Sequence, residues 1–553
     1  MRSEVRLKGW MKSSFKLTIA VAAVCVIVTA AGCKPSGGAS SGGGKPFPEL
    51  KLLYNTSEAH RTIAEAIQRM WAQELGIKVE LNNVEWKVYQ KNLQALDYDI
   101  ARAGWIGDYP DPNTFLDMFV TNGGNNQTGW SNKKYDDLIA AAAKEPDIAK
   151  RAKLLADAED ILVNKEMPIM PIYFYVNTNL IKSYVKNMEL NARDLHPLKE
   201  VYIEKGGKIL PPDKQVFRFS NHAEPESIDP EIMTGNVEFN IAQQLYEGLV
   251  VNDPKTLDPI PGMATSWDVS PDKKTYVFHL RKNATWSNGD PFTAEDFVYS
   301  WKRVLTPSTA SEYAYQLFYV KNGKPYYEGK IKDFKQVGIS APDPYTLKVE
   351  LENPTAYWLD LVTFHTLMPV NKKCVEKYGY KWTRPENIVT NGPFLLKEWA
   401  PKDHITMVKN PRYYDADKVR LTKLIAYPIE VETTNLQMFE SGEIDWMNTI
   451  PPSHMDKVKK WEEAHFTPFL STYYYRFNVT KPPLNDPRVR KALDLAVNKK
   501  EICEYVTKAG QKPATTFVPP ILKNYKSPEG LEYNPDLARK LLREAGYAVN
   551  VKK

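Results

Sequence analysis

The sequence is poor in cysteine and lacks the spacings that metal centres or disulfide frameworks require. Of its four Cys, Cys25 and Cys33 lie near the N-terminus, and only Cys374 and Cys503 remain in the body of the chain. The eight His are scattered, and no HExxH, CxxC or phosphate-binding loop occurs. We therefore expect no metal and no cofactor, and interpret the two body cysteines as buried small hydrophobes.

The chain also lacks a strong net charge. A formal charge of +6 over 553 residues, without a basic stripe or a recognition motif, argues against nucleic acid as a partner. The apolar stretch at residues 17–31 is too short and too rich in Ala for a membrane-spanning helix. Aromatic residues, at 12%, are abundant and suit either a core or pockets for varied side chains. A chain of this length is expected to form two or three domains.

The N-terminal segment is a targeting signal. Basic residues from Arg2 to Lys16 precede the apolar stretch, and Ala30-Ala31-Gly32 leads to Cys33. This site resembles a bacterial lipobox, with Ala30 where Leu is more usual. We predict a signal peptide at 1–32, lipidation of Cys33 and a Gly/Ser tether at 33–45. The expected location is extracytoplasmic, lipid-anchored to the bacterial cell membrane or periplasmic. The alternative is a cleaved secretory signal without lipid.

From residue 49 onward the chain alternates between strand and helix patterns. Strands are predicted at 50–54, 77–81, 168–176 and 216–219, a hairpin at 267–286, and helices at 60–75, 135–143, 148–163, 293–305 and 535–545. Thr293 and Asp296 form an approximate capping box for one helix. A Gly/Pro-rich stretch at 206–213 is interpreted as a linker. The alternation predicts an α/β fold with mixed sheets.

Several segments resemble the oligopeptide-binding proteins of ABC importers, extracytoplasmic solute-binding proteins of family 5. The most specific is the run 263–296, which contains MATSWD, TYVFHLRKNA and WSNGDPFTAED. NGPF at 391–394, NPRYY at 410–414, SGEID at 441–445 and PRVRKAL at 487–493 agree as well. The resemblance implies a two-lobed fold of the type II periplasmic-binding-protein kind with an extra domain, which encloses its ligand by hinge closure.

The order of these segments differs from that of the family. Segments like 207–553 come first in the family, and segments like 46–205 come last, so the chain is interpreted as one circularly permuted copy. The predicted domains are a second lobe at 46–172 and 472–553, a first lobe at 173–250 and 375–471, and an extra domain at 251–374. The first lobe includes the joining linker at 206–213, and the extra domain packs on the first lobe.

The resemblance implies capture of short peptides between the lobes and their delivery to an ABC-type permease. The peptide is expected to lie extended and to bond through its main chain. Asp108 matches the residue that accepts the peptide ammonium; the alternative is a cap of the turn in DYPDP. Arg102 and His60 are candidates for the peptide carboxylate; for Arg102 the alternative is an ion pair with Asp99.

Further residues are expected to contact the peptide backbone or to line side-chain pockets: Gly104, Trp105, Ile106, Tyr109, Trp86, Glu224, Tyr473 and Tyr475. Alternation puts Tyr473 and Tyr475 on one face of a strand and Tyr474 on the other, so at least one face belongs to the core. For Glu224 the alternative is a solvated loop residue.

Two alternatives remain open at this point. The same fold can bind dipeptides, cell-wall peptides, nickel complexes or oligosaccharides, or the chain is a rearranged product that binds nothing. An enzyme is not expected, because the one match to a nucleophile-elbow pattern, at 38–42, lies in the tether.

The expected partners are short peptides with a free amino terminus, the membrane subunits of an ABC permease and the membrane itself. The protein is expected to be a monomer.

Overall fold

The computed structural model describes residues 44–549 and 551; the predicted signal peptide and Cys33 lie outside them. Within this range the strands form one 11-stranded sheet and three smaller sheets. The large sheet is mixed: β1 (Leu50–Asn55) is parallel to β2 (Val79–Val84) and β3 (Ile100–Ile106), whereas β19 (Ala464–Phe477) is antiparallel to β3. The predicted α/β class with mixed sheets is confirmed.

The large sheet has the order β15-β16-β17-β8-β18-β4-β19-β3-β1-β2, and β20 pairs with β4. Its other members are β4 (Ile169–Ile181), β8 (Val216–Ser220), β15 (Phe394–Ala400), β16 (His404–Lys409), β17 (Lys423–Tyr427), β18 (Trp446–Met447) and β20 (Lys512–Pro513). The predicted strands at 50–54, 168–176 and 216–219 are all present. Below, β8 and β15–β18 with their helices are called the first lobe, and β1–β3 with theirs the second lobe.

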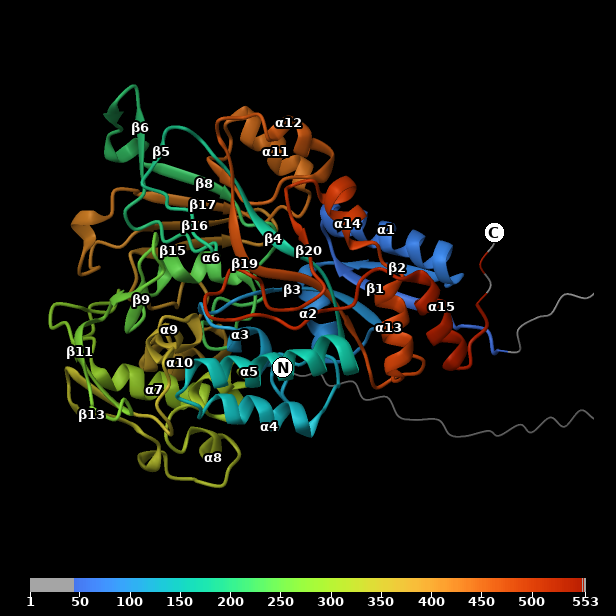
Figure 1. Ribbon diagram of the computed structural model, residues 1–553. Helices are drawn as coiled ribbons and strands as arrows, with labels where there is room; N and C mark the ends of the chain where they lie inside the picture. The colour runs from blue at the N-terminus through green and yellow to red at the C-terminus, as the bar shows by residue number, and fades with distance from the viewer. Residues whose placement is uncertain (1–43, 550, 552–553) are drawn as a thin grey trace, which may run out of the picture. The chain divides into compact units, whose positions relative to one another are not determined.

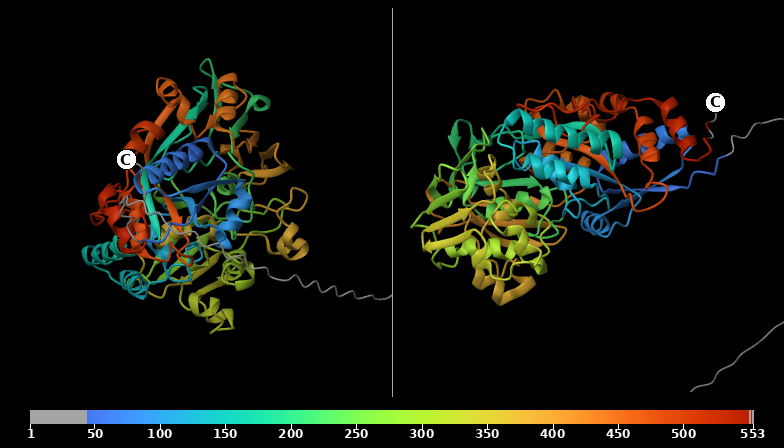
Figure 2. Two further views of the ribbon diagram at one scale, coloured as in Figure 1. Left: turned by 90° about the vertical axis from the view of Figure 1, so that its right-hand side faces the viewer. Right: turned by 60° about the horizontal axis from the view of Figure 1, so that its bottom comes forward.

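Two long strands connect the two lobes. β4 has 13 residues and β19 has 14, and they pair along much of their length, with a register shift between Pro468 and Thr472. One end of β4 pairs with β18, while residues 471–477 of β19 pair with β3. Figures 1 and 2 show the green and yellow segments gathered on one side of these strands and the blue and cyan segments on the other. The predicted lobe boundaries, 172/173 and 471/472, fall inside β4 and β19.

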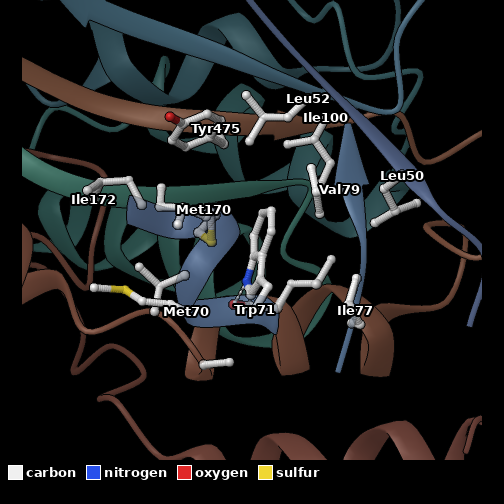
Figure 3. Close-up of a cluster of buried hydrophobic side chains, with 14 of the residues drawn as sticks. Leu50, Leu52, Met70, Trp71, Ile77, Val79, Ile100, Met170, Ile172 and Tyr475 are labelled. Atoms are coloured by element: carbon white, nitrogen blue, oxygen red, sulfur yellow. Dashed lines mark hydrogen bonds between the residues drawn. The ribbon is translucent and has the colours of Figure 1, made fainter. Parts of the chain in front are cut away.

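The core of the second lobe joins residues from both ends of the chain. α1 (Glu58–Leu75) begins at Ser57, whose Oγ accepts the His60 N–H, and ends at Gly76 in the left-handed conformation. Trp71 of α1 is fully buried and donates its indole N–H to the carbonyl of Leu493 at 2.8 Å (Figure 3). α13 (Pro487–Leu495) and α15 (Pro535–Glu544) pack beside it (Figure 1).

The predicted hairpin at 267–286 belongs to a separate sheet of four strands, in the order β11-β12-β14-β13. These strands are β11 (Ala264–Val269), β12 (Thr275–Leu280), β13 (Ile339–Asp343) and β14 (Thr346–Glu350). Helix α7 (Ala294–Val304) has the predicted capping box of Thr293 and Asp296 and packs on this sheet through a core that includes Phe278 and Trp301. This sheet and α7 are called the extra domain.

The remaining elements are short or peripheral. The helices are α2 (Trp86–Gln94), α3 (Asn113–Leu116), α4 (Lys133–Ala142), α5 (Ile148–Asp160), α6 (Asn236–Leu245), α8 (Gly323–Tyr327), α9 (Trp358–Val362), α10 (Lys372–Tyr378), α11 (Glu432–Ser441), α12 (Met455–Val458) and α14 (Lys499–Glu501). The strands are β5 (Val185–Lys186), β6 (Tyr202–Lys205), β7 (Lys208–Ile209), β9 (Val250–Asn252) and β10 (Pro259–Pro261). Over residues 44–549, none of the helices combines the length and the apolar character that crossing a bilayer requires.

The stretch predicted as a linker at 206–213 is more ordered than expected. Gly206 and Gly207, with φ of 58° and 71°, form the two-residue turn between β6 and β7. Positive φ at both central residues suits a tight hairpin turn, which is why two glycines stand there. The stretch is therefore a β-hairpin followed by a 3-10 turn at Pro212–Lys214.

The beginning of the described chain, at Lys45 and Phe47, lies beside residues 546–548 near its end. The Lys45 N–H donates to the carbonyl of Gly546 at 3.0 Å, and the Ala548 N–H donates to the carbonyl of Lys45 at 2.9 Å. The rings of Phe47 and Tyr547 are 4.9 Å apart. The two ends of the folded body thus meet beside α15.

Candidate functional site

A cavity of about 410 Å³ lies between the two lobes. The second lobe lines it with the end of β1, the start of α1 and residues 102–108. The first lobe contributes lining residues that include His222, Ala223 and Asn448. Three further lining residues, Tyr313, Phe364 and His365, belong to segments next to the extra domain in the sequence. β1 and β3 are parallel, so their carboxyl ends open toward the same cavity, the usual position of a ligand site in such sheets.

Hydrogen bonds between the lobes flank this cavity. The Trp86 indole N–H donates to Oε1 of Glu238 at 3.0 Å. The Ser57 hydroxyl donates to Oε1 of Glu432 at 2.5 Å, and the Thr433 N–H donates to Oε2 of Glu58 at 2.7 Å. The structure is therefore a closed arrangement, with second-lobe residues bonded directly to first-lobe residues.

One edge of β3 faces the cavity without a strand partner. β1 pairs with β3 only at Ile100 and Ala101, whereas β19 covers the other edge from Ile100 to Ile106. In an antiparallel ladder the N–H and C=O of one residue point to the same side. The Gly107 N–H donates to the carbonyl of Leu470, and the Trp105 carbonyl accepts from Ser471, so these residues face β19. The main-chain groups of Arg102, Gly104 and Ile106 therefore point away from β19, on the cavity side of the strand. The Arg102 carbonyl there already accepts a hydrogen bond from the Tyr89 hydroxyl.

Asp108 follows this edge directly and is 5% exposed. Its carboxylate accepts a hydrogen bond from Nε2 of Gln316 at 3.3 Å, and its N–H donates to Thr114 Oγ1 at 2.9 Å. Burial raises the pKa of the Asp108 carboxyl to about 7, although the charge of Arg193 lowers it. No Lys, Arg or His nitrogen within the described ranges lies within 4.0 Å of this carboxylate. Asp108 is thus a buried acid that forms no direct ion pair within the described part of the chain, although the charge of Arg193 acts on it.

The turn itself is held by a different residue. Asp111 Oδ1 accepts the Asn113 N–H at 2.9 Å, and both oxygens of Asp111 pair with Arg151 at 2.8 Å. The interpretation of Asp108 as a turn cap is therefore wrong, because Asp111 has that role.

Arg102 and His60 line the cavity near each other. Arg102 donates to the hydroxyl of Tyr175 at 2.7 Å and to Asn55 Oδ1 at 3.4 Å, and its Nε has no partner within the described chain. The alternative ion pair with Asp99 does not form, because Asp99 accepts the Lys51 N–H instead. Desolvation, with the charge of Arg102 next in effect, lowers the pKa of His60 well below its ordinary value. The imidazole of His60 is therefore neutral, and the positive charge that this pair presents to the cavity is the guanidinium of Arg102.

Gly104, Trp105, Ile106 and Trp86 also line the cavity. Trp105 is 7% exposed, stacks on Tyr313 with ring centroids 6.2 Å apart, and has an indole N–H without a partner in the described structure. A Cβ added at Gly104 would lie 3.1 Å from the Tyr175 hydroxyl and 3.3 Å from Nη2 of Arg102. A larger residue at 104 would therefore crowd the side chains that hold this edge.

Four predicted pocket residues do not line the cavity. Tyr109 points into the core of the extra domain, where it stacks on Tyr357 with centroids 4.9 Å apart. Tyr473 and Tyr475 are fully buried in the core of the second lobe, because β19 is a central strand covered on both faces. Tyr473 nevertheless lies behind Arg102, whose guanidinium is 4.9 Å from its ring. Glu224 accepts hydrogen bonds from the Trp399 indole and the Lys402 N–H, so it is neither a ligand group nor a solvated loop residue.

Sequence reasoning missed two buried arginines of the cavity wall. Arg193 donates its Nε to the carbonyl of Gly107 at 3.0 Å and so fixes the loop before Asp108. Arg476 follows the Tyr-rich strand and is 5% exposed. The only sequence signal for Arg476 was the presence of a charged residue within an apolar run of β19. No sequence signal indicated Arg193.

The fold and cavity together define a ligand-binding protein whose site is enclosed between two lobes joined by paired strands. The chain matches the sequence family described as "Bacterial extracellular solute-binding proteins, family 5 Middle" over residues 27–127 and 258–553. The chain belongs to the bacterial extracellular solute-binding proteins, family 5, a family of binding proteins.

Curated relatives match the sequence over part of their length. The chain is 41% identical over 351 residues to the periplasmic oligopeptide-binding protein OppA of Escherichia coli strain K12, covering 61% of this chain and 64% of that protein. It is 39% identical over 337 residues to the dipeptide-binding protein DppE of Bacillus subtilis strain 168, covering 60% and 61%. The chain thus spans less than two thirds of the length of these relatives.

Solved structures agree with the fold. The Haemophilus influenzae OppA complex with the peptide RPPGFSPFR has a TM-score of 0.58 and 37% identity over 61% of this chain and 67% of that one. The Escherichia coli murein tripeptide binding protein MppA has a TM-score of 0.58 and 34% identity over 60% and 66%.

Proposed function

We propose that this protein captures short peptides with a free amino terminus in the cavity between its lobes. The observation that carries the proposal is Asp108, a buried carboxylate that forms no ion pair within residues 44–549 and stands at the end of the open β3 edge. A peptide ammonium supplies the missing charge, and the β3 edge supplies main-chain partners that any peptide can use. Sequence tolerance follows, since every peptide offers the same backbone groups.

The other end of the peptide meets Arg102 and His60. A terminal carboxylate there accepts from the forked donors of Arg102 and offsets its charge. Asp108 favours a ligand that carries an ammonium over sugars or other uncharged ligands. The relatives named for oligopeptides, dipeptides and a murein tripeptide support a peptide ligand. The test is calorimetric titration with a free tripeptide and its N-acetyl form: binding of the free peptide alone supports the proposal, and equal binding of both contradicts it.

The protein delivers its peptide to the membrane subunits of an ABC permease and acts as a lipoprotein outside the cytoplasm. Cys33 carries the lipid, and residues 33–45 separate the body from the membrane. Mass spectrometry of the N-terminal peptide from the membrane fraction tests this: a diacylated Cys33 supports the anchor, and an unmodified N-terminus contradicts it.

The segment order is that of a circular permutation. The contact of Lys45 with Gly546 and Ala548 supports it, since chain ends that meet can be joined without moving either lobe. The exposed turn at Gly206–Gly207 is a suitable place for the ends of the unpermuted chain.

A reordered chain tests this interpretation. We expect residues 208–551 followed by residues 45–205 to fold cooperatively and to bind the same peptides with affinity within about threefold, because changing a loop closure alters stability by only ~0.6 kcal/mol per doubling of loop length. The measurements are thermal melting and peptide titration. A reordered chain that fails to fold would contradict the permutation.

A further inference from the structure

Arg476 is a buried cation at the cavity that forms no ion pair with a carboxylate of the described residues. It is 5% exposed, and its Nε and Nη2 donate to the hydroxyl of Tyr474 at 3.2 and 3.0 Å. Its Nη1 donates to Oε1 of Gln127. Within residues 44–549, no carboxylate oxygen lies within 4.0 Å of its guanidinium. Arg303, by contrast, pairs directly with Asp229 and Glu231. A buried guanidinium without a counter-charge is unfavourable unless something at the site supplies one.

The strand register puts Arg476 on the opposite face of the sheet from Arg102. Arg476 pairs with Ala101 and Tyr475 pairs with Arg102, and successive residues of a strand point to opposite faces. Arg476 thus shares its face with Tyr474 and Trp105, whereas Arg102 shares its face with Tyr473. The cavity wraps around the open β3 edge and includes both faces.

A peptide added along this edge points its side chains alternately to the two faces. Those directed to the Arg102 face meet His60 and Tyr175, and those directed to the other face meet Arg476, Gln127 and Trp105. The nearest acid, Glu312, is separated from Arg476 by Gln127, whose Nε2 donates to Oε2 of Glu312 at 2.9 Å. Donor hydrogens of the Arg476 guanidinium remain free for a ligand.

We propose that Arg476, oriented by Tyr474 and Gln127, forms a subsite for an Asp or Glu side chain of the bound peptide. The subsite is distinct from the one that Arg102 and His60 provide, and the proposal rests on peptide capture in this cavity. Arg476 is therefore a specificity-determining residue: it favours an acidic side chain at a peptide position whose side chain points to the Arg476 face of the added strand. A charge-assisted hydrogen bond to a buried carboxylate is expected to increase affinity about 10- to 100-fold.

The test uses tetrapeptides with a free amino terminus and an amidated C-terminus, so that the only carboxylate is a side chain. One Glu is moved through positions 2, 3 and 4 of an Ala background, and each peptide is compared with its Gln counterpart by calorimetric titration. We expect a 10- to 100-fold preference for Glu at one position or at two alternate positions. Arg476→Met removes this preference, and Arg476→Lys keeps part of it.

Two further variants make the result specific. Lys481→Met, which removes a nearby cation that does not line the cavity, is expected to leave the preference unchanged. Arg476→Glu is expected to prefer Lys over Gln at the same position. Thermal melting of each variant checks that it is folded.

Equal affinity for Glu and Gln at all positions, or a preference that survives in Arg476→Met, overturns the proposal. A preference that appears only with a free C-terminal carboxylate also overturns it, because Arg476 then binds the terminus. If the tetra-alanine amide itself does not bind, peptide capture fails as well, which separates failure of the function from failure of the subsite.

Discussion

Asp108→Asn is expected to weaken peptide affinity by about 100-fold or more. The substitution removes the negative charge that pairs with the peptide ammonium and leaves that ammonium buried and unpaired, which is more unfavourable than losing one hydrogen bond. Asn has almost the same shape as Asp, so its side-chain carbonyl oxygen can still accept a hydrogen bond from Nε2 of Gln316. Titration with a free tripeptide measures the loss, and an unchanged affinity would rule out Asp108 as the ammonium partner.

The same variant is expected to be more stable than the wild type at high pH. The pKa of Asp108 is raised from 3.8 to about 7 in the folded protein, so ionisation destabilises the fold progressively as pH rises through that window. At 1.36 kcal/mol per pH unit, the destabilisation is about 4 kcal/mol at pH 8 and about 1.5 kcal/mol at pH 5. Asn does not ionise and so avoids this destabilisation. The increase in melting temperature of Asp108→Asn over the wild type should therefore be larger at pH 8 than at pH 5.

Asp117→Asn is the matched control. Asp117 is also a buried acid whose pKa burial raises well above its ordinary value, but it lies outside the cavity lining, hydrogen-bonded to Asn113 at 2.8 Å. It should raise stability at pH 8 and leave peptide affinity unchanged. Loss of affinity in both variants would mean that general changes in the loop, rather than the Asp108 charge, control binding.

Peptide affinity is expected to rise steeply between pH 5 and pH 7. The ammonium binds the ionised form of Asp108, and below its pKa of about 7 the ionised fraction falls tenfold per pH unit. Affinity at pH 5 should therefore be about 100-fold weaker than above pH 7, and binding near pH 6 should release close to one proton.

The measurement is titration across pH in buffers of different ionisation enthalpy. His60 acts in the opposite direction, since a bound carboxylate favours its protonated form, and His60→Gln removes that contribution. In Asp108→Asn the rise between pH 5 and pH 7 should disappear. A pH-independent affinity in the wild type would contradict the buried, unpaired state of Asp108.

Local sequence patterns were sufficient for most of the fold. The period of apolar residues identified α1, α5 and α15, and turn and capping residues identified the β11–β12 hairpin and the start of α7. These signals lie within about 20 residues and depend on local geometry. The stretch predicted as a linker contains a β-hairpin at Gly206–Gly207, which local sequence does not reveal because glycine marks both flexible chain and tight turns.

Site residues could be predicted from the sequence only where one continuous segment fixes their position in the cavity. Residues 102–108 line the cavity because β3 ends there, and the family resemblance pointed to that segment. Tyr109 follows directly but turns into the extra domain, since Tyr357, nearly 250 residues away in sequence, provides its stacking surface. Arg476 was missed for a similar reason: the lack of a counter-charge is a property of the assembled cavity and leaves no mark in the sequence.

The central claim is that the cavity binds the free amino terminus of a peptide at Asp108. The most direct measurement is calorimetric titration at pH 8 of the chain lacking residues 1–33, with trialanine and with N-acetyl-trialanine. We expect binding of trialanine and at least about 100-fold weaker binding of the acetylated form, because acetylation removes the charge that Asp108 pairs with. Equal binding of the two peptides, or binding of neither by the folded protein, would contradict it.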